Sequence, residues 1–134
     1  MASGAYSRFK ANLMNKEVDL EGDTIKVMLL DNSHSFTAAD NVIGDVNANE
    51  ISGTAYVAGG ATLANKAVTQ AATTKFDADD TVWSAATFSA WHAVIYDVTA
   101  TSNLMISLDF GGEQALVAAD FTIKWHADGI ITIA

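Results

Sequence analysis

The chain has 134 residues, half of them apolar, with no cysteine, no proline and a formal net charge of −9. The length is that of one ordinary domain, and the missing cysteines exclude disulfides, thiolate metal sites and cysteine nucleophiles. The acidic balance, with no Lys or Arg from Val27 to Asn65, argues against nucleic acid and anionic membranes as partners, because both need a basic patch. We expect a single domain over residues 1–134, made in the cytoplasm and not secreted, since no signal peptide or membrane span is visible.

The N-terminal segment Ser3–Lys16 is expected to form a short helix with Ser3 as its N-cap. Its apolar residues follow helical spacing: Tyr6, Phe9, Leu13 and Met14. A helix of this length is marginal alone, so it must pack on the body of residues 17–134 or on a neighbouring subunit. We therefore treat residues 1–16 as a helix or arm that could supply a contact between subunits.

The remainder of the chain reads as β-structure. Residues Thr24–Leu30 are apolar on both faces, which predicts a central strand. Residues Asp31–Gly53 are polar and irregular, with one helical turn expected within Thr37–Val46. Further short strands are predicted at Thr54–Val57, Thr62–Thr69, Thr73–Phe76, Thr81–Ser84, Phe88–Val98 and Leu104–Phe110.

The C-terminal region carries a hairpin signal. The alternating run Phe121–His126 and the apolar run Ile130–Ile133 flank Asp128-Gly129, a dipeptide that favours a tight hairpin turn. Many short strands at this spacing predict a mainly β fold, an antiparallel sandwich or barrel-like domain with a short N-terminal α-helix.

The residues give little sign of chemistry. The three histidines, His34, His92 and His126, have no metal-ligand spacing; we interpret His34 as a loop residue and the other two as strand residues. The acidic run Asp77–Asp80 is interpreted as a turn, with a calcium site left open. Gly59-Gly60 lacks the phosphate-loop pattern and is assigned to backbone geometry, such as positive φ or a close approach.

No catalytic, cofactor-binding or metal-binding residue is assigned, and we expect no enzyme activity. A nucleophile elbow of the form G-x-S-x-G is missing from the sequence. Trp91 and Trp125 lie in alternating strands and are expected in the core, whereas Trp83 follows the acidic turn and is the tryptophan expected at the surface.

Several runs in order along nearly the whole chain resemble small virion proteins of tailed bacteriophages. They are Phe9-Lys10-Ala11-Asn12-Leu13, Val18-Asp19-Leu20, Asp23-Thr24-Ile25-Lys26-Val27, Asn49-Glu50-Ile51-Ser52-Gly53-Thr54 with Tyr56, Gly59-Gly60 and Leu63, Phe76-Asp77-Ala78-Asp79-Asp80 with Trp83, Ala93-Val94-Ile95-Tyr96, and Phe121-Thr122-Ile123-Lys124-Trp125 with Asp128-Gly129-Ile130. The resemblance implies a virion structural protein and brings no catalytic residues.

Within that class the expected function is that of a capsid decoration, or cement, protein. Such a protein would bind major capsid subunits and itself, as a homo-oligomer such as a trimer, and the candidate contact residues are Tyr6, Phe9, Leu13 and Trp83. One alternative is a tail- or fibre-associated structural subunit. A second is a carbohydrate-binding β-sandwich, in which an exposed Trp83 and the Asp77–Asp80 turn would hold the sugar.

Overall fold

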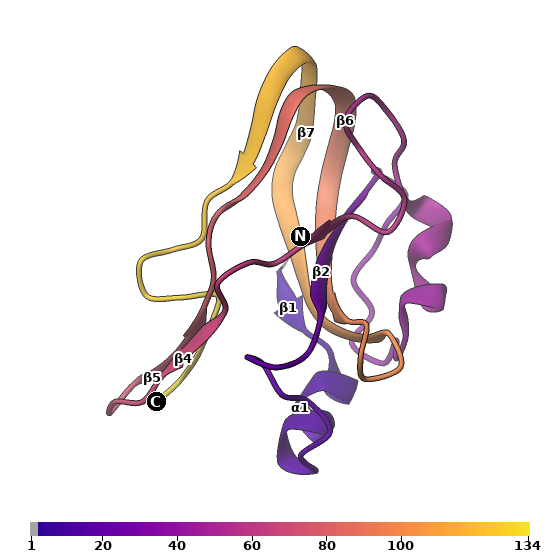
Figure 1. Cartoon of the computed structure of the whole chain (residues 1–134). Coiled ribbons are helices and arrows are strands. Elements are labelled where there is room, and N and C mark those ends of the chain that lie inside the picture. Colours follow the sequence, from indigo (N-terminus) through magenta and orange to yellow (C-terminus); the bar gives the residue numbers. More distant parts are fainter. Residues whose placement is uncertain (1–2) are drawn as a thin grey trace.

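The computed structural model describes residues 3–134 and consists mainly of two antiparallel sheets arranged like a sandwich, with one short α-helix (Figure 1). This confirms the expected mainly β fold, in its sandwich-like form. The larger sheet has the order β1 (Gly4–Ala5), β7 (Asn103–Ile123), β6 (Thr81–Asp97), β2 (Ile25–Leu30) and β3 (Ala61–Thr62). The smaller sheet has the order β4 (Ala67–Thr69), β5 (Thr74–Asp77) and β8 (Ile131–Ile133). The helical elements are α1 (Ser7–Met14) and the 3₁₀ turns η1 (Ile43–Asp45) and η2 (Asn47–Asn49).

The dominant element is the long antiparallel ribbon of β6 and β7, which pair from Thr81↔Ile123 to Asp97↔Asn103. The ribbon bends over at one end of the molecule (Figure 1). The register shifts three times between Trp83 and His92, and Ala85, Ala118 and Gly111 all have positive φ. Bulges of this kind bend a strand and increase its twist. We call residues 84–90 and 111–120 the arch.

Under the arch lies a cluster of aromatic rings. Trp83, Phe88 and Phe121 have ring centroids 5.6–6.3 Å apart, and Tyr56 and Phe110 extend the cluster. Trp83 is only 5% exposed, so its predicted surface position is wrong. The acidic turn before it did suggest exposure, but the curl of the ribbon turns this ring inward.

The central strand β2 is confirmed, with β6 on one side and β3 on the other. The long connection after it is largely irregular, as expected, and Glu50 anchors its end. Glu50 Oε2 accepts hydrogen bonds from the Tyr56 hydroxyl and the Gly59 amide, each at 2.7 Å. The Tyr56 oxygen in turn accepts from the Leu29 amide at 3.1 Å. Burial and the Glu50 carboxylate raise the pKa of Tyr56, so its hydroxyl keeps its proton and acts as a donor.

The N-terminal helix is shorter than predicted. It begins at Ser7 after the edge strand β1, and its N-cap position is Tyr6 rather than Ser3. Ser3 instead accepts a hydrogen bond from the Asp109 amide at 3.1 Å. Tyr6 and Phe9 are buried in the core, so this segment is an integral part of the body and not a detachable arm.

Other strand boundaries also differ from the prediction. The strands expected at Thr81–Ser84 and Phe88–Val98 form one strand, and the one expected to end at Phe110 continues to Ile123. The C-terminal hairpin prediction is wrong, because β8 pairs with β5 rather than with β7. The Thr62–Thr69 strand is divided between β3 and β4, and Thr54–Val57 makes only a single bridge, from Thr54 to Thr87.

The backbone at Gly60, after the long connection that follows β2, lies very close to β2. Its φ is +88°, and a Cβ there would overlap the Val27 carbonyl. We predict that Gly60→Ala lowers the free energy of unfolding, by about 1–3 kcal/mol from backbone strain alone. Chemical denaturation would measure this, with Gly44→Ala as the control because nothing lies within 4 Å of a Cβ at that glycine. Equal stability of the two variants would contradict the close approach.

Candidate functional site

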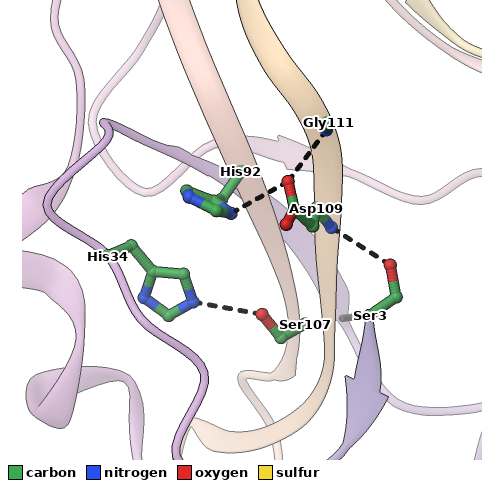
Figure 2. A network of polar contacts seen from close by, with 6 residues as sticks. All are labelled: Ser3, His34, His92, Ser107, Asp109 and Gly111. Carbon is green, nitrogen blue, oxygen red and sulfur yellow. Dashed lines mark hydrogen bonds and ion pairs between the residues drawn. The ribbon is translucent and has the colours of Figure 1, made fainter. Parts of the chain in front are cut away.

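A buried polar network joins the loop after β2 to the centre of the β6–β7 ribbon (Figure 2). His34 Nε2 lies 3.1 Å from Ser107 Oγ, and the rings of His34 and His92 meet edge to face at 5.1 Å between centroids. His92 and Asp109 are cross-strand neighbours, with 3.8 Å between His92 Nδ1 and Asp109 Oδ1. These residues lie far apart in the sequence, so no local sequence motif could have predicted that they form a cluster.

Asp109 is held by further contacts on both sides. Its Oδ1 accepts the Gly111 amide at 2.8 Å, and its own amide donates to Ser3 Oγ at 3.1 Å (Figure 2). A shallow surface hollow of about 370 Å³ reaches the network between Trp91 and the Gly111–Gly112 backbone. Trp91 is therefore half-buried at the rim of this hollow and lies outside the main core.

The network has the residue types of a catalytic triad but not its connectivity. Ser107 meets His34, whereas Asp109 meets His92, so no single histidine links the hydroxyl to the carboxylate. Ser107 is only 1% exposed, which leaves no access for a substrate to its oxygen. Burial, with a smaller contribution from His92, lowers the pKa of His34, so this ring is neutral at physiological pH. The arrangement suits a structural hydrogen-bond network.

The histidines and the acidic turn that the sequence analysis singled out do not form one site. His34 lies in a loop and His92 in β6, as expected, but His126 lies in a loop after β7 and not in a strand. In the acidic turn, Asp77 Oδ1 accepts the Ala78 amide at 2.9 Å and Asp80 Oδ1 accepts the Trp125 amide at 3.0 Å. Asp79 accepts from the Asn65 side-chain amide. Among residues 3–134, no group of three or more acidic or histidine side chains is placed to hold a metal ion.

An apolar groove opens on the surface between α1 and β8. It has a volume of about 480 Å³; α1 contributes Phe9, Lys10, Leu13 and Met14, and β8 contributes Ile131 and Ile133. Met14 is 89% exposed and Ile133 62% exposed, so both sides of the groove present large apolar side chains to solvent. We call this surface the α1–β8 groove.

The four predicted contact residues do not lie together. Tyr6 and Trp83 are buried in the chain's own core, and Phe9 is only 2% exposed although it lines the α1–β8 groove. Tyr6 and Phe9 are buried because apolar residues at helical spacing mark the face that packs on the sheet, whereas Trp83 lies in β6 and is turned inward by the bend of the ribbon. Leu13 lies in the α1–β8 groove, and the most exposed large apolar side chains, none of which was a predicted contact residue, are those of Met14, Val117, Val57 and Ile133.

Comparisons with protein-family models, curated proteins and solved structures find no match to this chain. In the described part of the chain, no helix is long and apolar enough to cross a membrane.

The neutral state of His34 predicts a specific pH dependence. The pKa of His34 in the folded protein is below its ordinary value of 6.5, so the unfolded chain binds more protons as the pH falls through that value. The contribution of His34 to stability therefore decreases from about pH 7.5 to about pH 5, and we predict that His34→Gln loses less stability, or gains more, than the wild type over this interval. Unfolding free energies at both pH values would measure it. His126→Gln is the control, because the His126 side chain is 76% exposed; an unchanged slope in His34→Gln would contradict the assignment.

Asp97, at the end of β6, contributes a pH dependence of stability that is opposite in sign to that of His34. Its side chain is fully buried, Oδ1 accepts the Ala100 amide at 3.0 Å, and Oδ2 has no hydrogen-bond partner within residues 3–134. Burial and the nearby Asp23 carboxylate raise the pKa of Asp97 from 3.8 to about 7. The folded state therefore binds more protons than the unfolded state between these values, and stability is lost as the pH rises through them.

We predict that Asp97→Asn stabilises the protein at about pH 8 by roughly 1–4 kcal/mol, because the variant no longer ionises a buried carboxyl. The gain disappears near pH 4, where the Asp97 carboxyl is already protonated in the folded state. Thermal or urea unfolding at the two pH values measures the difference. Asp128→Asn, at an exposed turn, serves as the control. A variant that is less stable than the wild type at both pH values would overturn this account.

Proposed function

We propose that the chain is a structural subunit of a bacteriophage virion, and specifically a capsid decoration protein. The observation that carries the proposal is a pair of exposed apolar surfaces at opposite ends of the molecule. One is the α1–β8 groove, and the other is the arch, where Val117 is 80% exposed. Figure 1 shows α1 and the bend of the β6–β7 ribbon at opposite ends of the molecule. Large exposed apolar side chains on a soluble domain mark contacts with other proteins.

The order of sequence runs that resembles phage virion proteins supports the same class. The buried polar network contributes rigidity to the subunit, since its groups are enclosed by the loop and the ribbon. The proposal includes a non-catalytic role. This role agrees with the pairing of Ser107 with His34 and of Asp109 with His92, in which no histidine links the hydroxyl to the carboxylate.

The proposed partners are the major capsid protein and further copies of the chain. Residues 17–134 carry four lysines and all sixteen acidic residues, a formal charge of −12. A surface of this charge complements a basic patch on a capsid subunit and would steer its approach. A carbohydrate-binding role loses its main support, because Trp83 is buried under the arch.

Binding to bare phage heads tests the proposal. We expect the wild-type chain to co-sediment with heads that lack decoration. Met14→Glu places a charge in the α1–β8 groove and should weaken the contact of the chain with its partners. We expect this variant to bind the heads at least about tenfold more weakly, because a particle surface that engages several contacts at once amplifies the loss of one contact. Val57→Glu is the matched control, since Val57 is also exposed but lies outside the α1–β8 groove.

The location of the chain in the particle separates the remaining alternatives. Wild-type chain that binds no heads would sink the decoration role. Chain found by mass spectrometry only in purified tails would replace that role with the tail- or fibre-associated one.

A further inference from the structure

We propose that copies of this chain associate head to tail, with the arch of one copy seated in the α1–β8 groove of the next. The contact needs only the isolated chain, so it stands or falls separately from the virion role. Four features carry it: the unpaired cations of one end, the acids of the other, the apolar centre of each surface, and the rigidity of the arch.

The charged residue in the lining of the groove is basic. Residues 1–16 contain Arg8, Lys10 and Lys16 and no acidic residue. Within residues 3–134 none of these cations lies within 4.0 Å of a carboxylate, because the two ion pairs found there both involve histidines. Lys10 lines the α1–β8 groove itself. A neighbouring hollow shares Leu13 with the groove and brings Lys16 together with Asp19 and Glu21, so Lys10 is the charged residue of the groove's own lining.

The arch end is acidic. Glu113 and Asp120 are its charged residues, and no Lys or Arg occurs in 84–90 or 111–120. Both carboxylates are held in place: Glu113 Oε1 accepts the Ser89 hydroxyl at 2.6 Å, and Asp120 Oδ1 accepts the Ala85 amide at 2.9 Å. A surface that is ordered before binding loses less entropy when it binds.

The two surfaces also match in apolar character and shape. Val117 projects from the arch between the two acids along the chain, and the groove of about 480 Å³ has a mostly apolar lining. Cavities of this volume accept whole small ligands, so the groove has room for Val117 and its neighbours. The outer edge of β7 also lacks a strand partner beyond Ser107 in the described residues, so the arch is open on that side.

Charge decides between this contact and a symmetric one. Groove against groove would bring together the cations of two α1 helices, and arch against arch would bring together Glu113 and Asp120 from both copies. Like charges across an interface are unfavourable, whereas the head-to-tail contact pairs opposite charges. A contact of this type leaves one free groove and one free arch in every chain of copies, so it either closes into a ring or grows.

Two single variants test the contact. Met14→Glu should disable the groove, and Val117→Glu should disable the arch; each is expected to be monomeric by analytical ultracentrifugation at low salt, where the wild type is larger than a dimer. Mixing the two variants leaves one intact groove and one intact arch, so we expect dimers and nothing larger. Val57→Glu, exposed elsewhere, should assemble like the wild type.

A charge exchange gives an independent measurement. Lys10→Glu and Glu113→Lys should each weaken assembly, and the double variant should regain it because the pair is restored with reversed sign. Circular dichroism and thermal unfolding confirm that each variant is folded; Met14→Ser and Val117→Ser replace any variant that is not. A monomeric wild type would overturn the proposal. So would loss of assembly in Met14→Glu but not in Val117→Glu, since that outcome indicates a symmetric groove contact.

Discussion

The β6–β7 pairing is the interaction on which the rest of the structure depends. β7 is bordered on its other side by β1, and β6 carries β2, so these two strands connect both edges of the larger sheet. The bulges around Ala85, Ala118 and Gly111 bend the ribbon far enough to bring Phe110 within 5.7 Å of Phe121, although both lie on β7. The bend encloses the aromatic cluster and at the same time exposes the arch.

The same ribbon organises the polar interior. Its centre places His92 opposite Asp109, and Ser107 two residues away on β7 meets His34 from the long loop. Buried polar groups stabilise a fold only when they find partners, and here the loop after β2 supplies one of them. Three buried side-chain atoms have no hydrogen-bond partner in the part of the chain that the structure describes: Asp97 Oδ2, Asn12 Nδ2 and the Tyr6 hydroxyl oxygen. Burial raises the pKa of Tyr6 to about 12, which keeps that hydroxyl neutral.

The sequence was sufficient for the class of fold but not for its long-range pairing. Apolar residues on both faces predicted β2 correctly as a central strand, because that signal depends only on local burial. The strand predicted at Leu104–Phe110 ends just before Gly111-Gly112, yet the structure continues this strand through both glycines with a bulge; a strand end and a bulge both need flexible backbone, and the sequence does not distinguish them. Asp128-Gly129 does form a turn, but the strand after it pairs with β5, more than fifty residues earlier in the chain. The polar network and the α1–β8 groove were beyond prediction for the same reason.

The central claim is that this chain is an assembly subunit whose two ends recognise each other. The most direct test uses the absence of native cysteine: Met14→Cys and Val117→Cys place one thiol at each end, and a short thiol-specific cross-linker reports their proximity between copies. Cross-linked dimers should form when the two single variants are mixed, and longer ladders should form from a chain that carries both changes. Cross-links between two Met14→Cys chains alone, or none in any mixture, would contradict the account.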